Sequence, residues 1–280
     1  MIAPKPLVPP PISAEMRAAF DRDGVIFLPG VFDAAWVDYM RDAVEAAMAS
    51  PGPLADNFSP NPAKGKFFGE HFLWIRLPAF RTIALDSPLP AVAAGLMGSK
   101  TATLAWDQVF VKEPRTEAES HWHQDQPYAW VDGQQNSSFW IALDDVTIES
   151  GAVEFVKGSH RWGRWFEPKS FHPDRQYAAG DYETMPDFSN KRGEYDIVHY
   201  DTKPGDVVGF HLSVVHYAPG NRTAGRRRAI SLRYAGDDAT FAVRKRGPKL
   251  PRDTGLKHGD PLKGDLFPVA WPRSSEARAG

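Results

Sequence analysis

Two histidines and one aspartate have the types and spacing of a metal site. His123 and Asp125 are separated by one residue, and His216 follows far downstream. Residues i and i+2 of a strand project to the same side of a sheet, so we expect His123 and Asp125 to reach one ion. Two imidazoles and one carboxylate are typical of a non-haem Fe(II) centre, because three ligands on one face of an octahedral ion leave the opposite face open for a co-substrate and dioxygen.

Other histidines leave a second ligand set open. His121 lies two residues before His123 and is expected on the same strand face. His121, His123 and His216 could then form the histidine-rich kind of site that cupins use. His211 lies shortly before His216, in a preceding strand-like segment, and we expect it to pack in the core or to support a ligand.

The composition excludes several other classes of site and partner. The chain has no cysteine, which excludes disulfides, thiolate metal sites and cysteine nucleophiles. Its 33 basic and 35 acidic residues nearly balance, so no net field favours nucleic acid. No stretch has the length and hydropathy of a signal peptide or a membrane span. The sequence therefore predicts a soluble, cytoplasmic protein without a nucleic-acid or membrane partner, and it leaves the oligomeric state open.

The elements that must position these residues divide the chain into four parts. Residues 1–12 are rich in proline and predict a flexible leader, and residues 13–280 predict a single domain. The first part of this domain, to about residue 100, is mainly helical. From about 101 to 240, short strand-like runs alternate with turns, which is typical of an antiparallel sandwich or barrel. Residues 241–280 form an extension.

Local signals refine this division. Ser13 and Asp33 can cap helices, the second of which carries an apolar stripe at helical spacing. We also expect a strand over 68–77 and a helix over 88–97. A segment over 162–192 interrupts the strand-rich part and is dense in proline, aspartate and aromatic residues. Long loops without periodicity are usually functional or mobile, so we expect this insert to act as a lid.

Several motifs surround the candidate ligands in a fixed order. They are residues 121–128 (HWHQDQPY), 140–145 (WIALDD), 149–152 (ESGA), 157–160 (KGSH), 204–211 (PGDVVGFH), 216–221 (HYAPGN) and 227–231 (RRAIS). This succession, over about Ala102 to Tyr234, resembles the phytanoyl-CoA dioxygenase family of Fe(II)/2-oxoglutarate oxygenases. Several motifs in the right order are more specific than any one of them. The matching segment 122–125 also favours Asp125 over His121 as a ligand.

The resemblance implies a mainly β fold with flanking helices and a double-stranded β-helix core, the jelly roll of cupins. It implies that His123, Asp125 and His216 bind Fe(II), and that Arg227 binds the distal carboxylate of the co-substrate 2-oxoglutarate. A planar guanidinium suits this role, because it matches a carboxylate through two hydrogen bonds and stays charged when desolvated. Arg228 should face the other way, and it takes the role if the strand register is shifted by one residue. Carbonyls or carboxylates should hold the second ring nitrogen of each histidine ligand.

The resemblance also places Gln108 and Trp140 in the co-substrate pocket. Gln124 could contribute, although a residue between two ligands on one strand should face away from the metal. Ala218 departs from the family pattern, since relatives often carry a hydroxyl two positions after the second histidine ligand. This change removes one possible hydrogen bond to the co-substrate and does not affect the iron site.

The reaction implied by the resemblance uses dioxygen and 2-oxoglutarate to hydroxylate a small or medium-sized organic molecule, with release of succinate and carbon dioxide. The carboxylate of Asp125 argues against a halogenase, in which a small residue leaves room for chloride. Two alternatives stay open: a non-catalytic cupin-like module that binds a metal or ligand, and a metal-dependent hydrolase or isomerase on the same barrel. Neither gives Arg227 a purpose. The aromatic residues that could line the substrate cavity, although core packing explains them equally well, are Phe68, Trp74, Tyr128 and Trp130.

Overall fold

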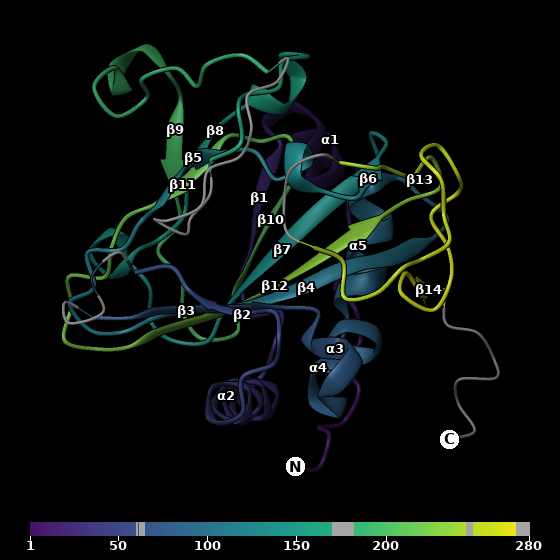
Figure 1. The fold of residues 1–280 in the computed structure, drawn as a ribbon, viewed down its shortest axis with the longest axis horizontal. Helices are drawn as coiled ribbons and strands as arrows, with labels where there is room; N and C mark the ends of the chain where they lie inside the picture. The colour runs from purple at the N-terminus through teal and green to yellow at the C-terminus, as the bar shows by residue number, and fades with distance from the viewer. Residues whose placement is uncertain (60, 62–64, 170–181, 245–248, 273–280) are drawn as a thin grey trace.

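The computed structural model describes residues 1–59, 61, 65–169, 182–244 and 249–272, and Figure 1 shows their arrangement. The α-helices are α1 (Ala14–Asp23), α2 (Ala34–Ala49), α3 (Leu73–Arg76), α4 (Pro78–Asp86) and α5 (Leu89–Met97). The strands are β1 (Val25–Leu28), β2 (Ala55–Asn57), β3 (Phe67–His71), β4 (Ala102–Lys112), β5 (Ser120–His123), β6 (Val131–Asp132), β7 (Asn136–Ala142), β8 (Glu154–Val156), β9 (Ile197–His199), β10 (Val207–Phe210), β11 (His216–Ala218), β12 (Arg227–Ala235), β13 (Thr240–Phe241) and β14 (Val269–Trp271). Within these described ranges, no helix combines the length and hydropathy needed to cross a membrane.

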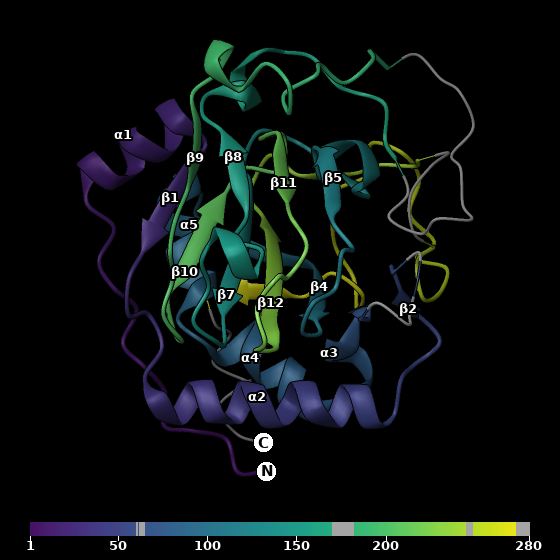
Figure 2. The same cartoon turned by 90° about the vertical axis from the view of Figure 1, so that its left-hand side faces the viewer.

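Two antiparallel sheets face each other and form the core of the fold. The larger sheet has the order β1-β10-β7-β12-β4-β3-β2, with β14 paired to β4, and the smaller sheet has the order β5-β11-β8-β9. Figure 2 shows the smaller sheet in front of the larger one. Strands that are far apart in the sequence are neighbours in both sheets, as in a double-stranded β-helix. The predicted mainly β, jelly-roll class is therefore confirmed.

Helices α2, α4 and α5 pack against the outer face of the larger sheet. Asp33 caps α2 by accepting a hydrogen bond from the Trp36 amide (3.0 Å), and Ser13 caps α1 through the Met16 amide (3.2 Å), as predicted. The apolar stripe of α2 is buried, in one cluster with α4, α5 and side chains of β4 such as Val109. Burial of this stripe holds the helices on one face of the sheet and leaves the other face for a site.

The larger sheet extends beyond the part of the sequence in which the jelly roll is expected. β1 and β3 lie within the first hundred residues and β14 lies after residue 240, yet all three pair into this sheet. β3 ends at His71 and α3 begins at Leu73, because Phe72 has a left-handed backbone conformation (φ 57°). The strand predicted over 68–77 is therefore wrong beyond His71. The helix predicted over 88–97 is confirmed by α5.

The leader, residues 1–12, contains neither helix nor strand but contacts the core. Leu7 packs against the main apolar cluster. The Lys5 carbonyl accepts a hydrogen bond from Trp36 Nε1 (2.9 Å). The flexibility of the leader stays a prediction.

The insert over 162–192 is described in part, because residues 170–181 lie outside the described residues. On either side of this gap, Phe166 and Phe188 are buried in a small apolar cluster with Trp122. The two described flanks of the insert are therefore anchored to the smaller sheet. Its action as a lid stays a prediction.

A buried acid lies on the helix side of β4. Asp107 is fully buried, and its Oδ2 accepts a hydrogen bond from the Trp74 amide (3.1 Å). Its Oδ1 has no hydrogen-bond partner among the described residues. Burial raises the pKa of Asp107 to about 8, against the opposing effect of the Trp74 amide. At pH 7 the native protein therefore holds this carboxyl mainly in its neutral form.

Asp107→Asn is expected to stabilise the protein relative to the wild type by an amount that grows with pH. An unfolded aspartate releases its proton near pH 3.8, whereas the native carboxyl keeps it to about pH 8. The wild type therefore loses stability as pH rises between these values, by up to about 1.4 kcal/mol per pH unit, and the asparagine variant does not. The free energy of unfolding of both proteins is measured in denaturant from pH 4 to 9. The difference between Asp107→Asn and the wild type should grow with pH up to about pH 8 and then stay constant. Asp42→Asn, at an exposed position of α2, is the control, and a gap independent of pH would contradict this expectation.

Candidate metal centre

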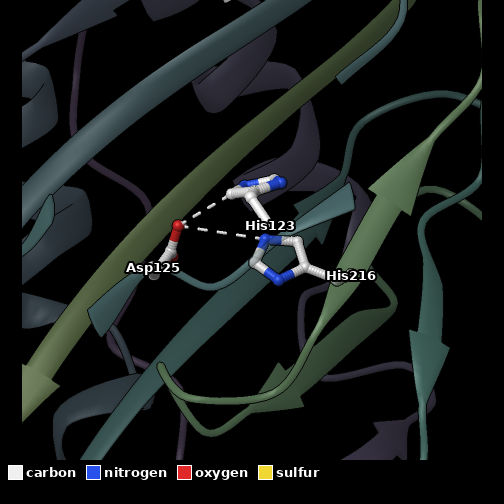
Figure 3. Close-up of side chains that lie close together, drawn as sticks. All are labelled: His123, Asp125 and His216. Carbon is white, nitrogen blue, oxygen red and sulfur yellow. Dashed lines mark ion pairs between the residues drawn. The ribbon is translucent and has the colours of Figure 1, made fainter. Parts of the chain in front are cut away.

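His123, Asp125 and His216 come together in a buried cluster (Figure 3). One ligand atom from each residue lies within 4.8 Å of the other two. Asp125 Oδ1 is 3.7 Å from His123 Nε2 and 3.8 Å from His216 Nε2. These separations exceed hydrogen-bond length and suit three donors directed at a single ion. The three side chains therefore fit an Fe(II) ion of the predicted kind.

Strand pairing and two hydrogen bonds orient the imidazoles. His123 ends β5 and lies directly opposite His216, the first residue of β11. His123 Nδ1 donates to the His121 carbonyl (2.6 Å), and His216 Nδ1 donates to the Val214 carbonyl (2.9 Å). Each ring therefore directs Nε2 toward Asp125. The carbonyl partners expected for the second ring nitrogens are confirmed.

Asp125 does not lie on the same strand as His123, which corrects one part of the prediction. β5 ends at His123. Asp125 has helical backbone angles (φ −72°, ψ −34°) and precedes a 3₁₀ turn over Gln126–Tyr128. This turn, and not the alternation of a strand, brings the carboxylate beside the imidazoles.

A β-bulge turns His121 away from the site. His216 is opposite His123, and Ala218 is opposite Ser120, so β5 has one residue more than β11 between the two pairs. The extra residue breaks the alternation of β5. As a result Ser120 and His123 both line the pocket, while the His121 side chain is 47% exposed. The structure thus separates His121 from the other two histidines.

The charges of the three residues suit a divalent cation. Burial and the neighbouring His216 lower the pKa of His123 to about 3, and burial also lowers the pKa of His216. Burial raises the pKa of Asp125, but the Arg233 guanidinium and the two imidazoles together bring it below its ordinary value. At neutral pH the site therefore presents two neutral imidazoles and one carboxylate, which are the protonation states that a metal requires.

Arg233 belongs to this site and was missed by the sequence interpretation. It lies on β12, and its Nε is 3.0 Å from Asp125 Oδ2. One signal could have found it: Arg233 follows Arg227 by an even number of residues, so both lie on the same face of an extended strand. A charged residue on that face, within an otherwise apolar strand end, indicates a buried polar partner.

Arg227, Gln108 and Trp140 line one pocket together with the three candidate ligands. Arg227 is 2% exposed, its guanidinium lies over the Trp140 ring (5.5 Å to the centroid), and Nη2 donates to the Gly151 carbonyl (3.1 Å). Within the described part of the chain, Arg227 Nε has no partner. Burial lowers the pKa of Arg227 to about 10, so it remains a cation at neutral pH. Ala218 also lines this pocket, so its position contributes no hydroxyl there.

The register of β12 separates the two neighbouring arginines. Arg227 is opposite Lys112 of β4, and Arg228 is opposite Val111. Arg228 forms ion pairs with Asp144 (2.7 Å) and Glu45 (3.0 Å) on the other side of the sheet. The predicted alternation of Arg227 and Arg228 is therefore confirmed.

Known proteins resemble this chain in sequence and fold. The profile of the phytanoyl-CoA dioxygenase (PhyH) family matches residues 20–229, which is most of the chain. The chain belongs to the phytanoyl-CoA dioxygenase family. The resemblance predicted from the order of the motifs is thereby confirmed.

Relatives and a solved structure agree with membership of the phytanoyl-CoA dioxygenase family. The ectoine dioxygenase of Sphingopyxis alaskensis is 28% identical over 245 residues, covering 80% of this chain and 76% of that protein. The L-proline trans-4-hydroxylase of Streptomyces griseoviridis is 26% identical over 245 residues, covering 80% and 86%. The structure of the non-heme alpha ketoglutarate dependent carbocyclase SnoK from nogalamycin biosynthesis has a TM-score of 0.75 at 26% identity, covering 92% of this chain and 96% of that one. The protein is an Fe(II)- and 2-oxoglutarate-dependent dioxygenase.

Two polar residues of the phytanoyl-CoA dioxygenase motifs hold the surrounding chain. Gln124 Nε2 donates to the Arg164 and Ser213 carbonyls (3.1 and 2.9 Å), and its Oε1 accepts from the Phe166 amide (3.1 Å). The Gln124 side chain therefore binds backbone groups away from the three candidate ligands, and its hydrogen bonds link the insert to the loop before β11. His211 Nδ1 accepts from the Ser213 amide (3.0 Å), which agrees with a supporting role.

Two of the four aromatic residues predicted to line the substrate cavity lie near the three candidate ligands or in the core beside them. The Tyr128 ring is 6.1 Å from the His123 ring, measured between centroids. Trp130 packs edge-on against Trp106 (5.8 Å) within the main apolar cluster. Neither is among the described residues that line the pocket around the three candidate ligands, so the predicted contact of Tyr128 and Trp130 with a substrate stays a prediction.

The other two lie on the helix side of the larger sheet. Phe68 and Trp74 pack into the apolar core there, so the structure does not bring them to the pocket. Phe67, next to Phe68 on β3, lines the pocket instead, together with Phe110. A shift of one residue on a strand exchanges the two faces, which is why a prediction based on residue type alone selected the wrong neighbour.

Proposed function

We propose that His123, Asp125 and His216 hold the Fe(II) of this dioxygenase and that Arg227 binds the distal carboxylate of 2-oxoglutarate. One observation supports this assignment most directly. Both histidine Nε2 atoms lie about equally far from one oxygen of Asp125, in a pocket that Arg227 also lines. A buried guanidinium whose Nε is unpaired among the described residues is unfavourable unless an anion completes its hydrogen bonds. The distal carboxylate of the co-substrate is such an anion.

Each protein group has a separate task in this assignment. Bound Fe(II) supplies the reaction with dioxygen that decarboxylates 2-oxoglutarate oxidatively. Arg227 holds the far end of the co-substrate, and the Trp140 ring supports the guanidinium. The His121 and Val214 carbonyls keep the two imidazoles in the tautomer that presents Nε2. Aromatic walls, including Phe110, keep water away from the reacting groups.

We infer that the reaction hydroxylates a small or medium-sized organic molecule and releases succinate and carbon dioxide. The carboxylate at Asp125 supports this inference, because it occupies the position that a halogenase leaves to chloride. The names of two relatives, ectoine dioxygenase and L-proline trans-4-hydroxylase, supply the first substrate candidates.

Succinate formation tests the proposed function. The Fe(II)-loaded protein is incubated with 2-oxoglutarate and dioxygen, alone and with ectoine or L-proline, and succinate and the oxidised product are measured by mass spectrometry. We expect slow succinate formation without a primary substrate and faster formation with one that fits. His216→Ala, which lacks one proposed ligand, is the control. A protein that binds Fe(II) and forms no succinate under any of these conditions would favour the non-catalytic cupin-like module.

A further inference from the structure

We propose that Arg233 binds a carboxylate of the primary substrate, at the end of the pocket away from Arg227. This inference rests on the proposed function and deepens it, because it names the chemical class of the substrate. The proposal predicts that the substrate is a small organic acid whose carboxylate binds beside the three candidate metal ligands.

Arg233 has more hydrogen-bonding capacity than the described residues use. It is 4% exposed, it lines the pocket, and its guanidinium lies over the Trp106 ring (4.8 Å to the centroid). A guanidinium has five N–H donors. Nε donates to Asp125 Oδ2 (3.0 Å), whereas Nη1 is buried and has no partner among the residues that the structure describes. Because a buried charged donor without an acceptor is unfavourable, the unpaired Nη1 indicates a ligand.

The charges around the pocket leave room for an anion at Arg233. Among the described residues that line it, Arg227 and Arg233 are cationic and Asp125 is the sole carboxylate. Asp125 Oδ1 is the atom nearest the two histidines, and Oδ2 is the atom bonded to Arg233. A carboxylate that serves a metal ion with one oxygen neutralises a guanidinium at the other oxygen only in part. A second carboxylate would complete both the charge and the hydrogen bonds of Arg233.

Apart from Asp125, the polar side chains near Arg233 carry no negative charge. Gln108 lines the pocket, and its Nε2 is 3.2 Å from His71 Nε2. His71 is buried, and burial followed by the charge of Arg233 lowers its pKa to about 3, so its imidazole is neutral. An amide and a neutral imidazole can orient a substrate but cannot balance a guanidinium.

Arg233 and Arg227 lie far enough apart to bind different carboxylates. An extended strand rises about 3.3 Å per residue, so their Cα atoms are separated by roughly 20 Å along β12. Arg233 forms an ion pair with Asp125, one of the three candidate ligands, whereas Arg227 lies near Trp140 and Gly151. A co-substrate that reaches from the metal to Arg227 therefore leaves the Arg233 end of the pocket for the primary substrate.

A matched pair of probes tests this proposal. Propionate and propionamide have nearly the same shape and differ in charge, and they are titrated into protein loaded with Mn(II) and saturating 2-oxoglutarate. Mn(II) accepts the same kinds of ligand as Fe(II), and it broadens the proton NMR signals of a probe bound beside it. We expect the wild type to bind propionate at least about tenfold more tightly than propionamide, because only propionate forms charge-assisted hydrogen bonds with Arg233.

Arg233→Gln is expected to bring the ratio of the two dissociation constants to about one, mainly by weakening propionate. Arg233→Lys should recover part of the preference, because it keeps the charge without the planar fork. The ratio of the two dissociation constants separates two roles of Arg233. If Arg233 only positioned Asp125, its replacement would weaken metal binding, and the binding of propionate and propionamide would then fall by the same factor. Arg228→Gln, on the other face of the same strand, is the control and should leave the ratio unchanged.

Several outcomes would overturn the proposal: no metal-dependent broadening of propionate, a wild-type ratio near one, or a preference that survives Arg233→Gln. Propionate binding that is seen without 2-oxoglutarate and lost at saturating 2-oxoglutarate would also overturn it, because the probe would then occupy the site at Arg227. Metal and 2-oxoglutarate binding are measured in the same samples. If both persist while the preference is absent, the carboxylate site fails and the proposed function stands.

Discussion

Asp125→Ala is expected to weaken Fe(II) binding by at least about 100-fold and to abolish succinate formation. Loss of a ligand should exceed the roughly 10- to 100-fold effect of losing a group that only supports a ligand. Oδ1 of Asp125 is the atom that both imidazoles approach, so the variant retains two neutral donors and no anion for the cation. Metal analysis after dialysis, together with an Fe(II) titration, measures the effect.

The fold of this variant needs its own control, because Asp125 also pairs with Arg233. Asp125→Ala leaves a buried guanidinium without its partner, which is expected to lower the free energy of unfolding by about 3–5 kcal/mol. His123→Ala and His216→Ala preserve the pair and should lose iron while keeping most of the stability. His121→Ala should keep its iron. Full iron occupancy in folded Asp125→Ala would contradict the ligand assignment.

Arg227→Ala is expected to raise the 2-oxoglutarate requirement by on the order of tens- to thousands-fold while iron binding survives. The variant leaves the distal carboxylate in a poorly solvated pocket without its cation, and loss of one partner of such a pair typically costs about 2–5 kcal/mol. Each ~1.4 kcal/mol corresponds to a tenfold change in affinity. A titration of 2-oxoglutarate, monitored by succinate formation, measures the change.

Two further variants separate charge from geometry and test the strand register. Arg227→Lys should recover part of the loss, because an ammonium keeps the charge but lacks the bidentate fork. Arg228→Ala should have little effect on 2-oxoglutarate, since Arg228 pairs with Asp144 and Glu45 on the other side of the sheet. An essential Arg228 with a dispensable Arg227 would contradict the register, and indifference to both would contradict the co-substrate assignment.

Residue types and local spacing predicted which side chains of the candidate site come together. The types and spacing of His123, Asp125 and His216, within motifs in a fixed order, were sufficient to predict their buried cluster and the family. The opposite orientation of Arg227 and Arg228 was also predictable, because β12 pairs with β4 at that point without a bulge and keeps its alternation. Local spacing carries this information without knowledge of which strands are neighbours.

The tertiary structure decided everything that depends on pairing between distant segments. A bulge in β5 opposite β11 turned His121 outward, and a turn after β5 placed the Asp125 carboxylate. The contact between Arg233 and Asp125 joins residues 108 positions apart. A period of two shows which residues share a face of a strand, but it does not show which strand lies opposite. A single extra residue also exchanges the faces of every residue beyond it, so only the assembled sheets determine what lines the pocket.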